Sequence, residues 1–276
     1  MNSLPTLFDL TRRVAIITGG AGLLGVQHAT IIAEAGGIPV LVDIQKTHVE
    51  EKAAAIAKQF GVDAIGRAVD ITSESAIKEL LREVTTLFGR VDILINNAAN
   101  NPRVEASTDV KFSRVENFPA AQWDADIAVG ITGAFLCSKV FGSHMAAAGG
   151  GVIVNIASDY GIIAPDQRIY QQPGLPEHLQ PVKPVTYPVV KSAVLGLTRY
   201  LATYWADKKV RVNALSPGGV ANNQPEDFVV RYTNLIPLGR MANPNEYRGA
   251  ILFLSSDASS FMTGANLVVD GGHSCW

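Results

Sequence analysis

Tyr187 and Lys191 stand four residues apart in the stretch TYPVVKSAV, residues 186–194. On a helix, side chains at this spacing share one face, with Cβ atoms roughly 5–6 Å apart. A free phenol has a pKa of about 10, and a neighbouring ammonium favours its deprotonated form. The resulting phenolate could remove the proton of an alcohol while a hydride leaves the carbinol carbon. The same spacing also arises by chance between a surface tyrosine and an unrelated lysine, so this chemistry needs support from other residues.

The helix that would carry this pair has a predicted start. Pro188 is compatible with it if Thr186 is the N-cap, because the first helical turn does not use the missing N–H. Ser158 ends the apolar run GVIVNIAS, residues 151–158, which we interpret as a strand. Open α/β sheets bind ligands at the carboxyl ends of their strands, where a hydroxyl could orient a substrate toward Tyr187. Taken singly, a serine at a strand end can also cap a turn.

A glycine-rich turn indicates where a dinucleotide would bind. TGGAGLLG, residues 18–25, follows a strand-like run and opens a predicted helix, so its backbone N–H groups could hold a pyrophosphate. Asp43 lies 18 residues later, at the end of the second strand. A carboxylate there can accept both ribose hydroxyls of NAD and would repel the extra phosphate of NADP. Ile44 and Gln45 follow it rather than a basic residue, which favours NAD. Asp70 closes the third strand similarly and could bond the adenine amino group.

The elements that must position these residues alternate along the chain. Short apolar runs predict strands, and the stretches between them have the length and pattern of helices. The predicted strands are 14–18, 38–44, 64–70, 91–97, 151–158, 210–216 and 266–271, and the predicted helices are 22–35, 47–60, 73–88, 121–148, 187–206 and 243–256. This alternation predicts one α/β domain over 1–276, with a parallel sheet covered by helices on both faces. Two long segments break the rhythm, 100–120 and the proline-rich 159–186, and such loops are usually functional or disordered.

Composition argues against several classes of protein. A net charge of −2 and a pI near 6.2 provide no basic stripe for nucleic acid and no basic cluster for an anionic membrane. The apolar runs are shorter than the ~20 residues that span a bilayer, and the N-terminus lacks a contiguous apolar core, so we expect neither a membrane anchor nor a signal peptide. Cys137 and Cys275 are the only cysteines, which favours a reducing cytoplasm. The histidines show no ligand spacing, so no metal site is predicted.

Taken together, the motifs resemble the short-chain dehydrogenase/reductase family in its compact branch. The matches run almost end to end: TGGAGLLG, Asp43, Asp70, NNAA at 96–99, Ser158, YPVVK, PG at 217–218 and TGANLVVDGG at 263–272. The resemblance implies a Rossmann-type doubly wound sheet of seven strands in the order 3-2-1-4-5-6-7 and a catalytic set of Ser158, Tyr187 and Lys191. It also implies a homotetramer or dimer, and a second role for Lys191 in holding the nicotinamide ribose.

The same resemblance assigns a cofactor site along the carboxyl edge of the sheet. Its predicted residues are Gly19, Gly22, Leu23, Leu24, Gly25, Asp43, Ile44, Asp70, Ile71, Asn97, Ala98, Tyr187, Lys191, Pro217, Gly218, Val220 and Asn222. Asn222 stands where a threonine usually contacts the carboxamide, and an asparagine could do the same. Residues 159–186 are predicted as an inserted substrate loop, and residues of about 219–242 as a C-terminal lid.

Three features depart from the family pattern. Leu23 replaces a glycine of TGxxxGxG, so the string becomes TGxxGxxG, common in the longer sugar-nucleotide branch. Gly130 stands where the family has a catalytic asparagine of the proton relay, and a glycine would leave space for a water. The gap of 29 residues from Ser158 to Tyr187 is longer than usual, so 159–186 is expected to lie over the pocket and shape the substrate site.

These features favour an NAD-dependent dehydrogenase that interconverts a secondary alcohol and a ketone, on a sugar, polyol or sugar derivative. The substrate class depends on the polar character of the insertion and on its resemblance to members found with glycan-modifying enzymes. The polar residues are Asp166, Gln167, Arg168, Gln171, Gln172 and Glu177. One alternative is a sugar-nucleotide epimerase or dehydratase, suggested by TGxxGxxG, although only about 60 residues follow the sixth strand. The other is a non-catalytic, cofactor-binding regulator that has lost the relay asparagine.

Overall fold

The predicted strands form a single parallel sheet. The computed structural model describes residues 4–100 and 110–276. Its strands are β1 Val14–Thr18, β2 Ile38–Asp43, β3 Ile65–Ala68, β4 Ile93–Asn96, β5 Gly151–Ile156, β6 Val210–Pro217 and β7 Asn266–Val269. They lie in the order β3-β2-β1-β4-β5-β6-β7, and each neighbouring pair is parallel. The predicted order is confirmed. Strands are added in one direction from β1 to β3 and in the other from β4 to β7, and such folds bind ligands at the crevice between β1 and β4, where this direction changes.

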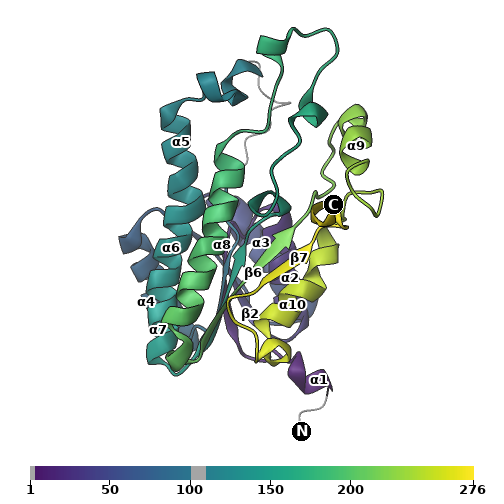
Figure 1. Cartoon of the computed structure of the whole chain (residues 1–276). Coiled ribbons are helices and arrows are strands. Elements are labelled where there is room, and N and C mark those ends of the chain that lie inside the picture. Colours follow the sequence, from purple (N-terminus) through teal and green to yellow (C-terminus); the bar gives the residue numbers. More distant parts are fainter. Residues whose placement is uncertain (1–3, 101–109) are drawn as a thin grey trace.

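Helices cover both faces of this sheet (Figure 1). Their bounds are α1 Leu4–Leu7, α2 Leu23–Glu34, α3 Lys46–Phe60, α4 Glu74–Phe88, α5 Ala120–Ile127, α6 Ala134–Cys137, α7 Ser143–Ala147, α8 Thr186–Tyr204, α9 Glu226–Thr233 and α10 Arg248–Ser255. On one face lie α2, α3 and α10, and on the other lie α4 to α8. The doubly wound α/β architecture predicted from the sequence is therefore present.

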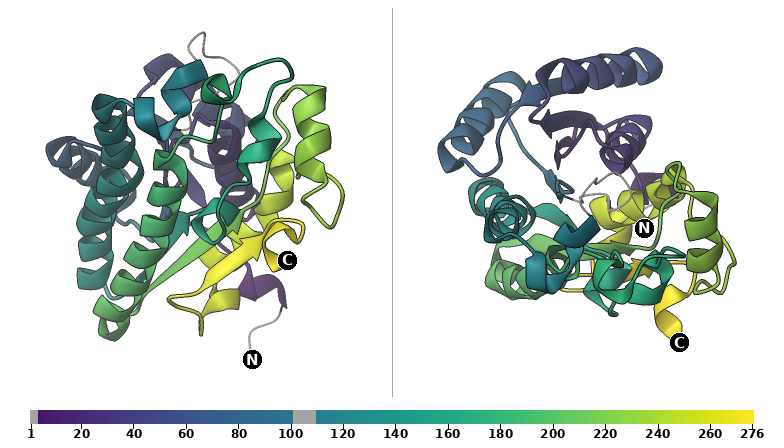
Figure 2. Two further views of the ribbon diagram at one scale, coloured as in Figure 1. Left: turned by 45° about the horizontal axis from the view of Figure 1, so that its top comes forward. Right: turned by 90° about the horizontal axis from the view of Figure 1, so that it is seen from above.

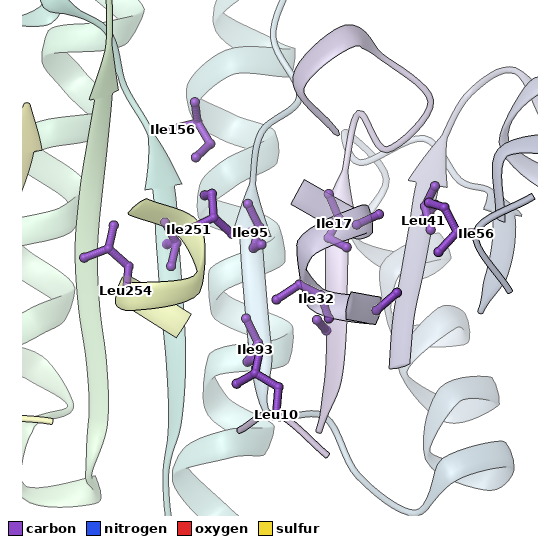
Figure 3. Packing of buried hydrophobic residues seen from close by; sticks show 14 of the residues in the cluster. Leu10, Ile17, Ile32, Leu41, Ile56, Ile93, Ile95, Ile156, Ile251 and Leu254 are labelled. Atoms are coloured by element: carbon purple, nitrogen blue, oxygen red, sulfur yellow. The ribbon is translucent and has the colours of Figure 1, made fainter. Parts of the chain in front are cut away.

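Two separate apolar layers hold the helices to the sheet. Figure 3 shows the first, in which Ile32 of α2, Ile56 of α3 and Ile251 of α10 pack on strand residues such as Ile17 and Ile95. The second contains the buried faces of α4 and of the helices that follow it, packed on the other side of the same strands. Strands buried on both faces read as continuous apolar runs, which explains the sequence pattern.

The helix predicted over 121–148 departs from regular geometry. It spans Ala120–Ala147, with π-helical turns at Ala128–Gly133 and Ser138–Gly142 separating α5, α6 and α7. Among the described helices it alone is long and apolar enough, by length and composition, to cross a membrane, with a mean hydropathy of 1.4. Half of that apolar stretch is buried inside the fold, as expected for a helix packed on a sheet.

The loops that follow the strands gather at one end of the molecule. β3, β4 and β5 end earlier than predicted, so Asp70, Asn97 and Ser158 lie just beyond the carboxyl ends of these strands rather than within them. Residues 159–186, here called the inserted segment, rise beyond this edge beside α9, as Figures 1 and 2 show. The first predicted break, 100–120, lies partly outside the described residues; its remainder forms short 3₁₀ turns at Val110–Ser113 and Val115–Asn117.

Candidate active site

A cavity of about 590 Å³ lies at the carboxyl edge of the sheet. It is lined by the glycine turn after β1, the end of β5, the start of α8 and the loop after β6. The predicted catalytic residues Ser158, Tyr187 and Lys191 all lie on its wall. Side chains from elements far apart in the sequence therefore meet in one place, as the parallel topology requires.

Tyr187 and Lys191 lie one helical turn apart near the start of α8. Lys191 Nζ is 5.7 Å from the centroid of the Tyr187 ring and donates a hydrogen bond to the carbonyl of Ile156 at 2.7 Å. Burial raises the pKa of the Tyr187 phenol to about 12, while a hydrogen bond with Ser158 acts in the opposite direction. Burial also lowers the pKa of the Lys191 ammonium to about 8. The pair has the geometry of a base and its supporting cation, inside a pocket that disfavours both charges.

The start of α8 differs from the prediction in one detail. Val185, not Thr186, precedes the first helical residue, and the hydroxyl of Thr186 donates to the buried carboxylate of Asp126 on α5. The Thr186 side chain thus connects two helices instead of capping its own. Pro188 is still tolerated, since it lies within the first turn, where backbone N–H groups lack intrahelical partners.

Ser158 is fixed by a network that the sequence interpretation missed. Its Oγ donates to Asp159 Oδ1 at 2.6 Å and accepts from the backbone N–H of Tyr160 at 3.3 Å. The other oxygen of Asp159 contacts His273 Nδ1 at 2.9 Å and accepts from Tyr232 at 3.3 Å. All of these groups are buried. The network holds the serine oxygen on the cavity wall and joins it to the last residues of the chain.

The glycine turn has the close packing that a pyrophosphate cradle needs. Gly19 adopts a left-handed φ of +61°, and a Cβ on Gly25 would lie 2.1 Å from the carbonyl oxygen of Gly19. Asn97 braces the turn, since its side chain donates to the carbonyls of Thr18 and Gly19 at 3.0 and 3.1 Å. Leu23, which replaces the second glycine of the family pattern, is 42% exposed and lines the cavity, so its side chain does not crowd the turn. These features fit a dinucleotide phosphate at the N-terminus of α2.

Asp43 lies beside this turn, where its Oδ2 accepts from the backbone N–H of Ala21 at 3.2 Å. Asp70 instead holds its own loop, because its Oδ1 accepts from both the N–H and the hydroxyl of Thr72. The cavity wall includes most of the predicted cofactor residues: Gly22, Leu23, Leu24, Asn97, Tyr187, Lys191, Pro217, Gly218, Val220 and Asn222. It does not include Gly19, Gly25, Asp43, Ile44, Asp70, Ile71 or Ala98, which lie beside it or beneath the turn. Ile71 in particular belongs to the apolar core under Gly133.

The position of the expected relay asparagine offers no space. Gly130 is buried in a π-helical turn, and a Cβ there would lie 2.4 Å from Val190 Cγ1 of α8. The expectation that this glycine leaves space for a water is therefore wrong. The glycine serves instead to let α8 approach its neighbour closely, one turn away from Tyr187.

The inserted segment and the predicted C-terminal lid pack together over the site. Ile169 and Tyr170 of the segment form an apolar cluster with Tyr232 and Ile236 of the lid, and Tyr187 packs against it. Arg231 Nε also donates to the carbonyl of Ile169 at 2.8 Å. The cluster is separate from the two layers on the sheet, so the two segments form a small roof of their own.

The polar residues that suggested a sugar site do not line this cavity. Asp166 and Arg168 pair with each other, and Gln167, Gln171, Gln172 and Glu177 are exposed. The segment instead contributes Asp159, Tyr160, Tyr170 and Lys183 to the wall. Only the position of Asp159 and Tyr160, directly after Ser158, could have signalled this from the sequence. In the described part of the chain, no three His, Cys, Asp or Glu side chains are placed to hold a metal ion.

Comparisons with known proteins agree with this arrangement. A family model described as short chain dehydrogenase matches residues 13–170, and one described as enoyl-(acyl carrier protein) reductase matches residues 177–274. An NAD-dependent glycerol dehydrogenase from Listeria innocua is 33% identical over 96% of this chain and 95% of its own. An NADP-dependent mannitol dehydrogenase from Hypocrea jecorina is 31% identical over 99% of this chain and 96% of its own. The crystal structure of a short-chain type dehydrogenase/reductase from Mycobacterium marinum has a TM-score of 0.85 at 30% identity, covering both chains fully.

Proposed function

We propose that the substrate of this protein is a sugar, polyol or sugar derivative and that the protein prefers NAD. The premise is that this chain belongs to the short chain dehydrogenase family and is an oxidoreductase that acts on CH–OH groups. The observation that carries the proposal is the meeting of Ser158, Tyr187 and Lys191 on one cavity that also reaches the glycine turn. A secondary alcohol held there would lie between a proton acceptor and the place of a nicotinamide ring.

The chemistry assigned to the protein is proton transfer and orientation. A bound nicotinamide cofactor would supply the acceptor or donor of the hydride. The Tyr187 oxygen would take the proton of the substrate hydroxyl in oxidation and return it in reduction. Lys191 would favour the phenolate by its charge, which opposes the effect of burial. Ser158, held by Asp159, would keep the reacting oxygen within reach of Tyr187.

The substrate class is supported by the relatives and by the cavity wall. Two proteins that match this chain over nearly their whole length are named for glycerol and mannitol, which are polyols. The wall carries the amide side chains of Asn222 and Asn223, which can bond hydroxyls. The amide hydrogens of Asn97 and both ends of the Gln224 side chain are instead engaged with backbone groups. Tyr170, Phe228 and Met241 supply an apolar side, as is usual for sites that bind small molecules.

Replacing Tyr187 with phenylalanine tests the proposed mechanism. The ring and its packing in the roof cluster remain, and only the hydroxyl that transfers the proton is lost. We expect turnover to fall by at least about a hundredfold, with NADH affinity, measured by fluorescence titration, changed less than about threefold. Near-normal turnover in a screen of polyols and sugars would remove Tyr187 from the mechanism.

Asp43 is proposed to set the cofactor preference. Its carboxylate lies at the end of β2 next to the glycine turn, with no basic residue directly after it. The relatives include both NAD- and NADP-dependent enzymes, so the family alone does not decide. Asp43→Ala should weaken NADH binding more than NADPH binding, because ribose bonds are lost while phosphate repulsion is relieved. A native enzyme that binds NADPH more tightly would contradict this assignment.

We also propose a homo-oligomer, a dimer or tetramer, in the cytoplasm. The rings of Tyr200 and Tyr204, on the outer side of α8, stack with their centroids 5.9 Å apart, and both residues are mostly exposed. β7 is an edge strand, with one side unpaired in the single chain. Apolar side chains and an open strand edge are features that contacts between copies commonly cover. Sedimentation velocity would measure the state of assembly, and a monomer at all concentrations would contradict it.

A further inference from the structure

Asp159 places a buried carboxyl group directly after Ser158. It is 2% exposed, and among the described residues that line the cavity it alone is acidic. Ser158 Oγ donates to Asp159 Oδ1 at 2.6 Å, and the backbone N–H of Tyr160 donates to the same oxygen at 2.8 Å. Ser158 also forms a hydrogen bond with Tyr187. One serine hydroxyl therefore joins this carboxyl group to the proposed proton acceptor.

The hydroxyl of Ser158 has a single hydrogen, and two oxygens compete for it. A serine hydroxyl donates once and accepts through its lone pairs. That hydrogen would stabilise a Tyr187 phenolate, but a carboxylate also binds it, in a short and charge-assisted hydrogen bond. While Asp159 holds the hydrogen, Ser158 can only accept on the side of Tyr187. Asp159 therefore opposes the phenolate in two ways, by taking this hydrogen and by its own negative charge.

His273, from the chain after β7, meets the other oxygen of this carboxyl group. Its Nδ1 lies 2.9 Å from Asp159 Oδ2, and Tyr232 donates to the same oxygen at 3.3 Å. Because a carboxylate can only accept, Nδ1 is the ring nitrogen that carries a hydrogen. With the two donors on Oδ1, four donors surround the carboxylate, which matches the lone pairs that it offers. Each donor withdraws negative charge from Asp159, so His273 weakens its hold on the Ser158 hydrogen.

The backbone around His273 keeps the imidazole in this place. Asp270 accepts from the N–H of Gly272 at 2.9 Å through one oxygen, and from the N–H of Ser274 at 2.8 Å through the other. Gly272 has a left-handed φ of +91°, which residues with a side chain rarely adopt. The residues on both sides of His273 are thus held, and the side chain between them is 6% exposed. The contact with Asp159 is a fixed part of the fold.

Other titratable groups face these residues from the neighbouring elements. Two ammonium groups face Tyr187, with Lys191 Nζ 5.7 Å and Lys183 Nζ 4.1 Å from its ring centroid. The phenols and the carboxyl group that face Asp159 or His273 are those of Tyr160, Tyr232, Tyr247 and Asp270. Burial is the largest cause that raises the pKa of Tyr187 to about 12; the hydrogen bond with Ser158 lowers this pKa, and the charge of Asp159 raises it. The ammonium groups favour the phenolate, and Asp159 acts against them.

We propose that Asp159 and His273 are positioning residues that control, through Ser158, how readily Tyr187 becomes a phenolate. Asp159 opposes the phenolate, and His273 limits that opposition. This inference rests on the proposed function, because it assumes that Tyr187 is the proton acceptor. The two residues contact each other, yet their replacement should have opposite effects on Tyr187, which a purely structural role would not produce.

A direct titration of Tyr187 tests the pair without relying on turnover. A tyrosine fluorinated on its ring and incorporated at position 187 alone reports its ionisation by fluorine NMR, in the cofactor-free protein and with NAD. Asp159→Asn removes the charge and keeps the shape, and Asp159→Ser is a second neutral variant. His273→Leu removes the donor, whereas His273→Asn keeps an amide near the position of Nδ1. Asp63→Asn and His48→Leu are the exposed controls, and melting temperatures report folding.

Asp159→Asn should lower the pKa of this phenol by at least about 0.5, and His273→Leu should raise it by at least about 0.5. His273→Asn should raise it less than His273→Leu does. In either neutral background at 159, His273→Leu should change the pKa by less than about 0.2, because His273 acts through the carboxylate. Shifts of the same sign, an unchanged pKa in Asp159→Asn, or an effect of His273→Leu that survives in a neutral background would overturn the proposal.

Failure of this pair and failure of the proposed function give different results. For a polyol that the native protein oxidises, the pH at which oxidation reaches half its maximal rate should follow the order of the titration, since oxidation needs the phenolate. A protein that oxidises no polyol or sugar contradicts the proposed function, and the titration still decides the effect of Asp159 and His273. Oxidation that Tyr187→Phe abolishes, together with an unshifted titration in Asp159→Asn, contradicts only the role of the pair.

Discussion

Burial around Tyr187, the proposed proton acceptor, opposes the charges that this chemistry requires. It raises the pKa of Tyr187 to about 12 and lowers that of Lys191 to about 8. Alcohol oxidation needs the phenolate and benefits from the ammonium, and burial disfavours both of these charged forms. The single hydrogen bond from Lys191 to the carbonyl of Ile156 satisfies only one of three ammonium donors. Lys191 is therefore expected to destabilise the cofactor-free protein.

Lys191→Met should make the cofactor-free protein more stable at pH 7, by about 1–3 kcal/mol. A lysine with a lowered folded-state pKa carries its full penalty below pH 8, where folded and unfolded chains are both protonated. Between pH 8 and about 10.5 the unfolded chain holds more protons, so the stability of the native protein rises with pH and the advantage of the variant shrinks. Urea denaturation at pH 7 and pH 10 measures this, with Lys58→Met as the exposed control. A less stable Lys191→Met at pH 7 would contradict it.

At the scale of elements, the approach of α8 to the irregular helix 120–147 decides how Tyr187 is placed. Gly130 permits that approach because Val190, three residues after Tyr187, occupies the space where its Cβ would be. On the same helix pair, Thr186 donates to Asp126 of α5. Both contacts lie within the first turns of α8, so they set the position of Tyr187 and Lys191 relative to β5.

Gly130→Ala should destabilise the protein by about 1–3 kcal/mol, because the new methyl group would lie 2.4 Å from Val190 Cγ1. Adding Val190→Ala should recover part of this loss, so the two changes should be non-additive in a double-mutant cycle measured by denaturation. Gly196→Ala is the control, since Gly196 lies in α8 with no atom within 4 Å of its added Cβ. That change should stabilise by up to about 1 kcal/mol. Additive effects at 130 and 190 would show that the clash is relieved by other movements.

At the scale of the whole molecule, we propose that the Rossmann body binds the cofactor and that the roof selects the substrate. The roof combines the inserted segment with α9 through the cluster of Ile169, Tyr170, Tyr232 and Ile236. The outer part of the roof, residues 172–180, forms a separate loop, because the side chain of Gln180 makes two hydrogen bonds with the backbone of Gln172. Residues 173–179, between these two glutamines, contribute nothing to the cavity wall.

Two deletions should therefore have different effects. Replacing 165–183 with a short linker removes Tyr170 and Lys183 from the wall, and should raise the Michaelis constant for the substrate at least about tenfold while NADH affinity stays within about threefold. Replacing only 173–179 with two glycines should change both constants less than about threefold. Steady-state kinetics and NADH titration measure the two quantities. Unchanged kinetics after the longer deletion would show that the roof is a surface feature or a contact between subunits.

The sequence by itself determined the order of strands and helices, and it was sufficient to propose the catalytic set of Ser158, Tyr187 and Lys191. Apolar runs such as VAIIT and GVIVNIAS are local signals, and a parallel topology necessarily brings their carboxyl ends to one edge. Ser158, Tyr187 and the glycine turn could be placed together for that reason. The chemistry of TYPVVKSAV was readable because i and i+4 on one helix meet whatever the tertiary structure is.

Only the tertiary structure decided which side chains surround that set. His273 reaches Asp159 across 114 residues, Val190 fills the space beside Gly130, and Lys183 covers Tyr187 while the polar residues around it face solvent. These contacts join segments whose sequences have no common period, so no local pattern encodes them. They depend on how loops pack once the sheet has formed, which is a property of the folded chain as a whole.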